Sequence, residues 1–152
     1  MVRSRRSDTV RTVGDLDAIT ALVHVYAERL DTGDLDGVAH LFDHATWRSQ
    51  TGEVRRGFDE VRPVYDRVIL YEGTPRTKHL MTNLTIDLVD GAASADARCY
   101  FTVLQGVTPG EPIVPILSGR YVDRFERFGG EWRFADRLFL VDLVGDLSRH
   151  YR

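Results

Sequence analysis

Residues 77–105 read TKHLMTNLTIDLVDGAASADARCYFTVLQ. Two β-rich runs, 77–89 and 92–105, flank the turn pair Asp90-Gly91. Runs of this kind joined by an Asp-Gly turn predict a β-hairpin. This hairpin indicates that the second half of the chain is a sheet.

Two further β-rich runs follow, over 113–127 and 131–144, with Gly129-Gly130 between them. They predict two more strands joined by a tight turn. Gly119 lies inside the first run, at a position where a long strand can bulge and bend. We therefore expect a strongly curved mixed or antiparallel sheet.

The residues before the hairpin have helical periodicity instead. Apolar side chains recur at helical spacing from Asp15 to Leu30, which predicts a first helix that the following Asp31-Thr32-Gly33-Asp34 breaks. Asp34 can cap a second short helix that continues to Phe42. The two helices should form a helical hairpin.

Between these helices and the sheet, residues 45–49 suggest a short strand. Apolar residues from Phe58 to Ile69 suggest a third helix, against which Pro63 argues. Helices followed by an antiparallel meander predict an α+β fold in which the helices cover one face of the sheet. We expect one domain over residues 12–152 and a frayed basic tail over residues 1–11.

The composition excludes several classes of protein. A net charge of −3 and a pI near 5.9 give no basic footprint for nucleic acid. No stretch approaches the roughly 20 apolar residues of a membrane-spanning helix. Cys99 is the only cysteine, so no internal disulfide or paired-cysteine zinc site is possible, and its strand spacing predicts a core position. We expect a cytoplasmic protein with no nucleic-acid or membrane partner.

Four segments carry a resemblance to a known family. They are Tyr26-x4-Asp31-Thr-Gly-Asp-Leu-Asp, Arg76-Thr-Lys-His79-Leu-Met-Thr-Asn83, Gly119-Arg-Tyr-x-Asp-x-Phe and Gly130-Glu-Trp-Arg-Phe134. Their order and spacing resemble the nuclear transport factor 2-like, or SnoaL-like, family over roughly residues 12–150. The resemblance implies a cone-shaped α+β barrel, with N-terminal helices packed on the sheet around a pocket, and a homodimer or homotrimer.

Asp31 and His79 look like the Asp-His dyad of scytalone dehydratase, hexachlorocyclohexane dehydrochlorinase and bile acid 7α-dehydratase. The resemblance implies that His79 is the base that abstracts a proton and that Asp31 orients it. Tyr26 matches an active-site tyrosine of the bile acid enzyme. Leu30 stands where scytalone dehydratase has a tyrosine, and Val103 or Leu104 falls where relatives place a second polar catalytic group. Because of these departures, the resemblance does not identify the substrate.

The chemistry of the two residues agrees with these roles. An imidazole titrates near pH 6.5, so His79 can accept a proton at physiological pH. Asp31 lies at a helix C-terminus, where the helix dipole disfavours a negative charge unless a donor such as His79 compensates it. The alternative is that Asp31 is a turn residue and His79 a structural strand residue.

Trp47 and Asn83 are expected to line the pocket, Trp47 by stacking and Asn83 by hydrogen bonding. The strand arginines Arg98, Arg120 and Arg137 are expected to face solvent rather than substrate.

Other histidines are poorer candidates. Asp36, His40 and His44 recur at helical spacing, but the helix is expected to end near Phe42, so we expect no metal site. His24 and His150 are not expected to be catalytic.

The sequence thus favours a cofactor-independent lyase of the dehydratase type, acting on a small hydrophobic, polyketide-like or steroid-like substrate. Isomerisation or cyclisation by the same base is an alternative. A non-catalytic small-molecule-binding or oligomerisation module is another.

Overall fold

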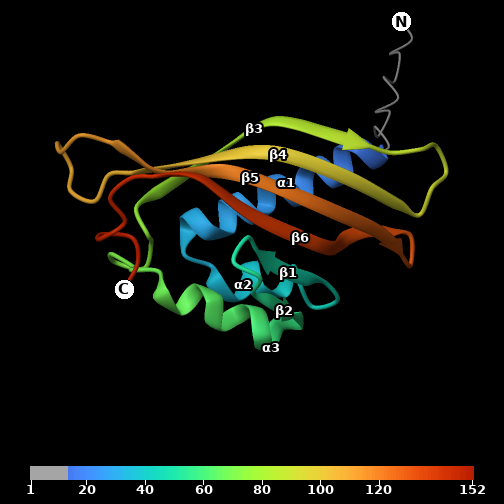
Figure 1. Ribbon diagram of the computed structural model, residues 1–152, viewed down its shortest axis with the longest axis horizontal. Helices are drawn as coiled ribbons and strands as arrows, with labels where there is room; N and C mark the ends of the chain where they lie inside the picture. Colours follow the sequence, from blue (N-terminus) through green and yellow to red (C-terminus); the bar gives the residue numbers. More distant parts are fainter. Residues whose placement is uncertain (1–13) are drawn as a thin grey trace, which may run out of the picture.

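The computed structural model describes residues 14–152 (Figure 1). The tail expected over residues 1–11 lies outside the described residues. The first helix, α1, spans Asp15–Thr32 and ends at Gly33, whose φ of 79° is left-handed. The N–H of Gly33 donates to the carbonyl of Leu30 at 3.1 Å. This C-cap ends the helix just after Asp31.

The second helix, α2, spans Leu35–His40, and Oδ1 of Asp34 accepts a hydrogen bond from the Gly37 N–H at 2.9 Å. The predicted capping role of Asp34 is therefore confirmed. The predicted third helix is divided into α3, Gly57–Val61, and a 3₁₀ helix, η1, Arg62–Arg67. The change coincides with Pro63, which has no N–H for an α-helical hydrogen bond.

Six strands form one mixed sheet in the order β2-β1-β6-β5-β4-β3. β1 pairs with β6 in parallel, and every other neighbouring pair is antiparallel. The strands span Thr46–Ser49 (β1), Val54–Arg56 (β2), Thr77–Asp87 (β3), Ser94–Gln105 (β4), Val114–Phe128 (β5) and Glu131–Val144 (β6). The expected curved sheet is confirmed, but it is open, with β2 and β3 as its edges, rather than a closed barrel.

Gly119 allows the sheet to bend, as its position in the sequence suggested. The pairing of β5 with β6 shifts register between Ser118 and Gly119. A Cβ atom at Gly119 would lie 2.0 Å from the carbonyl oxygen of Leu140 and 2.8 Å from the ring of Phe101. Only glycine permits this close approach of β5 to β6.

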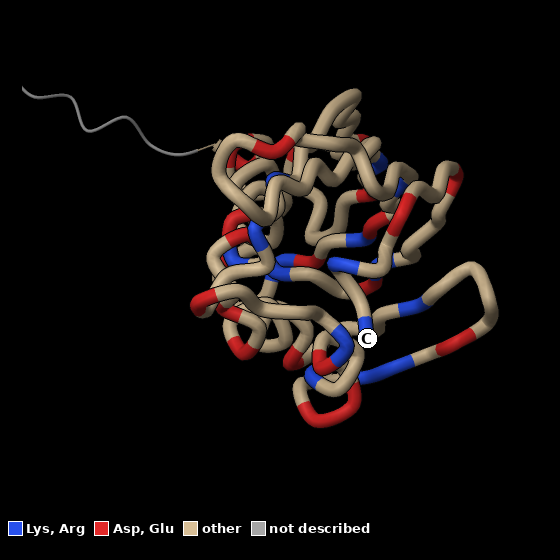
Figure 2. The backbone as a smooth tube through the Cα atoms, turned by 90° about the vertical axis from the view of Figure 1, so that its left-hand side faces the viewer, with Lys and Arg blue, Asp and Glu red and all other residues tan. Residues whose placement is uncertain are grey.

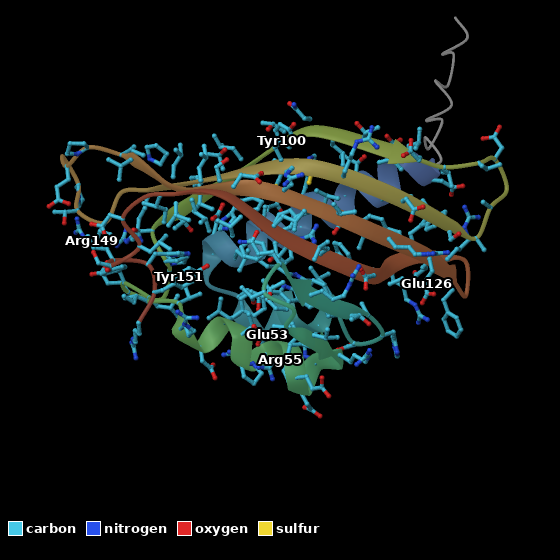
Figure 3. The ribbon with its side chains drawn as sticks, in the orientation of Figure 1. Glu53, Arg55, Tyr100, Glu126, Arg149 and Tyr151 are labelled. Atoms are coloured by element: carbon cyan, nitrogen blue, oxygen red, sulfur yellow. The ribbon has the colours of Figure 1, made fainter. Side chains whose placement is uncertain are left out.

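The helices and the β1–β2 hairpin lie on one side of the strands β3–β6 (Figure 1). On β4, alternate residues from Ala95 to Val103 are buried on that side. Cys99 is among them at 1% exposure, and burial raises the pKa of its thiol to about 11, so it is a core residue. Tyr100 projects from the opposite, outer face (Figure 3).

Acidic and basic residues are interspersed along the backbone (Figure 2). Within residues 14–152, no helix has both the length and the apolar character needed to cross a membrane.

Candidate active site

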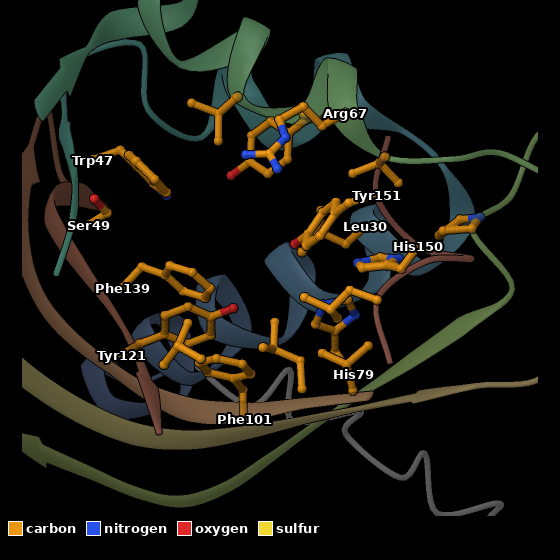
Figure 4. Close-up of a pocket in the computed structure, with 18 of the residues that line it drawn as sticks. Leu30, Trp47, Ser49, Arg67, His79, Phe101, Tyr121, Phe139, His150 and Tyr151 are labelled. Carbon is orange, nitrogen blue, oxygen red and sulfur yellow. The ribbon is translucent and has the colours of Figure 1, made fainter. Parts of the chain in front are cut away.

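A cavity of about 330 Å³ lies between the helices, β1 and the inner face of the sheet. Its size is in the range of small-molecule sites, about 300–1,000 Å³. Trp47, Phe101, Tyr121 and Phe139 form an aromatic wall, and His79 and His150 lie at the other end (Figure 4). The cavity therefore combines a largely apolar lining with imidazoles at one end.

Asp31 and His79 meet at that end of the cavity. Nδ1 of His79 lies 2.6 Å from Oδ1 of Asp31, and the backbone N–H of His79 donates to Oδ2 at 2.8 Å. The Thr77 hydroxyl donates to Oδ1 at 2.9 Å. Both side chains of the dyad are only 8% exposed. The last turn of α1 and the start of β3 thus hold the carboxylate and imidazole in one geometry.

The electrostatics of Asp31 determine the tautomer of His79. Burial opposes ionisation of Asp31, but the hydrogen bonds and charge of His79, with the Thr77 hydroxyl, outweigh burial and lower its pKa. An ionised carboxylate only accepts hydrogen bonds, so Nδ1 of His79 carries the proton. In the neutral ring, Nε2 then has the free lone pair that a general base needs.

Tyr26 belongs to a group of phenols that line the same cavity. Its hydroxyl lies 3.3 Å from that of Tyr65, and its ring packs edge-on against Tyr121 with centroids 5.5 Å apart. Burial raises the pKa of both Tyr65 and Tyr121 well above 10. These two phenols stay protonated and can donate hydrogen bonds. The sequence did not single out Tyr65 or Tyr121 as site residues.

The expectation that Arg137 faces solvent is wrong. Arg137 is 0% exposed, and its Nε and one terminal nitrogen donate to the two oxygens of Asp123 at 2.8 and 2.7 Å. Its guanidinium carbon lies 4.1 Å from the ring centroid of Tyr26 and 3.9 Å from that of Tyr121. Burial opposes the charge, but Asp123 outweighs it, so the pKa of Arg137 is raised.

Arg137 is therefore a fixed cation beneath the tyrosines, where cation–π contacts hold the rings. Arg98 and Arg120 are exposed, as expected, and pair with Asp87 and Asp142.

Of the two residues expected to line the pocket, Trp47 lies in the cavity wall and Asn83 does not. Trp47 lines the cavity and stacks with Phe139, with centroids 6.2 Å apart. Asn83 is exposed and is not among the residues that line the cavity. It lies in the bulge between Thr82 and Thr85 with a φ of 53°. The extra residue of the bulge breaks the alternation that would have directed Asn83 inward.

His150 is a site residue that the sequence did not reveal. It is 4% exposed and lines the cavity. His150 lies near the end of the sequence, where no helical or strand periodicity predicts whether a side chain is buried. A pairing of Val68 with Tyr151 brings this segment back over the cavity.

Two of the residues considered for a metal site, Asp36 and His40, instead contact other side chains. Asp36 accepts a hydrogen bond from Arg62, and Nδ1 of His40 lies 3.1 Å from Asp43. Within the part of the chain that the structure describes, no group of three acidic, histidine or cysteine side chains could hold a metal ion.

The fold matches that of a known family. The model of the SnoaL-like domain matches residues 11–138. The chain belongs to the SnoaL-like family. Its α+β fold, helical cover and pocket are those that the sequence resemblance implied. No curated protein sequence is significantly similar to the chain.

Solved structures agree on the fold. A putative scytalone dehydratase from Novosphingobium aromaticivorans superposes with a TM-score of 0.69 at 22% identity, covering 87% of each chain. LinA superposes with a TM-score of 0.66 at 19% identity, covering 86% of this chain and 88% of its own.

A protein of unknown function from Mycobacterium tuberculosis superposes with a TM-score of 0.68 at 28% identity, covering 86% of this chain and 77% of its own. These similarities show the fold, and leave the chemistry of this chain to its own residues.

Proposed function

We propose that this SnoaL-like protein is a cofactor-independent lyase that eliminates water or another small leaving group from a hydrophobic carbonyl compound. The observation that carries the proposal is the buried hydrogen bond between Asp31 and Nδ1 of His79 at the end of an apolar cavity. This bond leaves Nε2 of His79 as the atom that takes the proton. The family's dehydratase-related neighbours support the same class of chemistry.

The reaction begins when Nε2 of His79 removes a proton from a carbon next to a carbonyl group. The electron pair of the broken C–H bond moves into the carbonyl as an enolate, and then expels a hydroxyl from the neighbouring carbon. The imidazolium proton can leave with that hydroxyl as water. Asp31 stabilises the imidazolium and fixes the orientation of the ring.

Tyr26 has the role of binding the carbonyl oxygen, with Tyr65 beside it. A phenol hydroxyl that donates to an oxygen as negative charge develops stabilises the enolate more than the ketone. Arg137 supports Tyr26 and Tyr121 from beneath and does not line the cavity. Trp47 forms part of the apolar surface against which the substrate stacks.

The test uses 3-hydroxy-1-tetralone, which loses water by this reaction to give a cyclic enone that tautomerises to 1-naphthol. Formation of 1-naphthol is followed by fluorescence with the wild-type protein and with His79→Asn and His24→Phe. His24 is an exposed histidine on α1 and serves as the matched control. We expect His79→Asn to lower the rate about 10²-fold or more, as expected for loss of a general base, and His24→Phe to retain it.

The same base can catalyse isomerisation or cyclisation if it returns the proton to the enolate or lets the enolate attack a carbonyl. Exchange of the α-proton of 1-tetralone in D₂O, followed by NMR, detects proton removal without elimination. Exchange that depends on His79 with no formation of 1-naphthol would favour an isomerase or cyclase. Neither exchange nor elimination above the His79→Asn background would favour a binding module.

We also infer that the outer face of the sheet mediates a homodimer or homotrimer. Leu80, Tyr100 and Val122 are exposed there on adjacent strands. Light scattering coupled to size-exclusion chromatography measures the mass, and Tyr100→Glu should shift it towards the monomer.

A further inference from the structure

His150 is held at the wall of the cavity by its backbone. Its carbonyl accepts a hydrogen bond from the Ile69 N–H at 2.9 Å, and its own N–H donates to the Leu147 carbonyl at 2.9 Å. The side-chain amide of Gln105 donates to the neighbouring carbonyl of Arg149 at 3.1 Å. These bonds anchor the backbone from which the ring of His150 projects.

The imidazole of His150 has an unused hydrogen-bonding atom. Its Nδ1 is buried and has no hydrogen-bond partner among residues 14–152. The ring lines the cavity at the same end as His79 (Figure 4). Because Nδ1 is enclosed, a molecule bound in the cavity would hydrogen-bond the ring through Nε2.

The surroundings of His150 keep the ring neutral. Burial, together with the proximity of His79, lowers the pKa of His150 to about 4. A neutral imidazole has one N–H donor and one acceptor nitrogen and no charge. Such a ring matches a carbonyl or hydroxyl oxygen better than a carboxylate or phosphate, which would favour a cation. Its place beside the dyad puts this oxygen near the carbon that His79 deprotonates.

We propose that His150 is a specificity-determining residue that hydrogen-bonds a neutral carbonyl or hydroxyl oxygen of the substrate beside the reacting carbon. The substrate class is then an oxygenated ring compound rather than a hydrocarbon or a halogenated hydrocarbon. The family match ends at residue 138, so His150 lies in a segment outside it. The inference rests on the proposed function only for the identity of the reacting carbon.

Binding of two matched probes tests this role without requiring turnover. 1-Tetralone and tetralin have the same two fused rings, and only the first has an oxygen. This carbonyl oxygen has two lone pairs, so it can accept a hydrogen bond from His150 in addition to one from Tyr26. Their dissociation constants are measured with the wild-type protein, His150→Phe and the control His24→Phe. We expect the preference for 1-tetralone over tetralin to fall about tenfold in His150→Phe, the size of one neutral hydrogen bond, and to be unchanged in His24→Phe.

A second measurement uses the wild-type protein and so does not depend on the folding of a variant. Ring ¹⁵N resonances of His150, assigned by comparison with His150→Gln, should shift on addition of 1-tetralone and stay in place on addition of tetralin. An unchanged preference in a folded His150→Phe, unmoved resonances, or no binding of 1-tetralone would overturn the inference. A protein that shows the predicted preference but no proton removal by His79 would defeat the proposed function alone.

Discussion

Nδ1 of His79 lies 2.6 Å from Oδ1 of Asp31, although 48 positions separate the two residues in the sequence. Asp31→Asn removes the charge that fixes the His79 tautomer and stabilises its imidazolium. We expect the rate of 1-naphthol formation to fall about 10²-fold or more, because the base loses its orientation. Ring ¹⁵N shifts of His79 should show the tautomer change.

Thr77→Val is the matched control for this prediction. It removes another hydrogen bond to the same carboxylate oxygen while it preserves the shape of a buried side chain. We expect it to change the rate less than tenfold, since the charge of Asp31 remains. Equal rates for Asp31→Asn and Thr77→Val would contradict the orienting role of Asp31.

His150 should make the protein sensitive to mild acid. Its pKa is about 4 in the folded protein and near 6.5 in the unfolded chain. Between these values the unfolded chain binds more protons, so the free energy of unfolding falls as the pH drops from 6.5 to 4. The full effect is on the order of 3 kcal/mol.

Urea denaturation at several pH values measures this contribution. The loss of stability between pH 6.5 and pH 4 should be smaller in His150→Phe than in the wild type, and His24→Phe should follow the wild type. Parallel curves for all three proteins would show that His150 is not buried in the neutral form.

The buried pair of Arg137 and Asp123 should be important for stability. Arg137→Met leaves the carboxylate of Asp123 buried without its partner, and we expect a loss of about 3–5 kcal/mol in the free energy of unfolding. Arg120→Met breaks the exposed pair with Asp142 between the same two strands, and its effect should be far smaller. Chemical denaturation compares the two variants, and similar losses would argue against the buried pair.

Gly119→Ala should disturb the bend of the sheet. The added Cβ would lie 2.0 Å from a backbone oxygen, which cannot move aside as a flexible side chain can. We expect a loss of at least about 1–3 kcal/mol, the usual cost of overpacking. Gly14→Ala is the control, because its nearest contact there is a side-chain oxygen at 3.9 Å. Thermal unfolding at the same temperature for both variants would refute a steric role for Gly119.

Local signals in the sequence were sufficient for much of the fold. The helical stripe, the Asp34 cap, the turn pairs and Gly119 each depend on neighbouring residues, so their physical cause is visible in a short window. The pairing of Asp31 with His79 could be predicted for another reason. The motifs that contain these residues resemble those of a family whose members share an Asp-His dyad. The geometry of this pair agrees with that expectation, and its role in catalysis stays a prediction.

The inward or outward direction of other side chains was decided by tertiary structure. Strand alternation does not say which face α1 will cover, so the sequence predicts an exposed Arg137, whereas the structure buries it. The bulge in β3 moved Asn83 out of the expected alternation, because one extra residue reverses the direction of those that follow.

By itself, the sequence determined the α+β order of elements, their main boundaries and the candidate dyad, because these depend on local periodicity, turn chemistry and recognisable motifs. Only the tertiary structure decided that Arg137 lies under the tyrosines and that His150 joins the cavity. Both depend on contacts between segments distant in the sequence, and the burial that sets their charge exists only once those segments pack together.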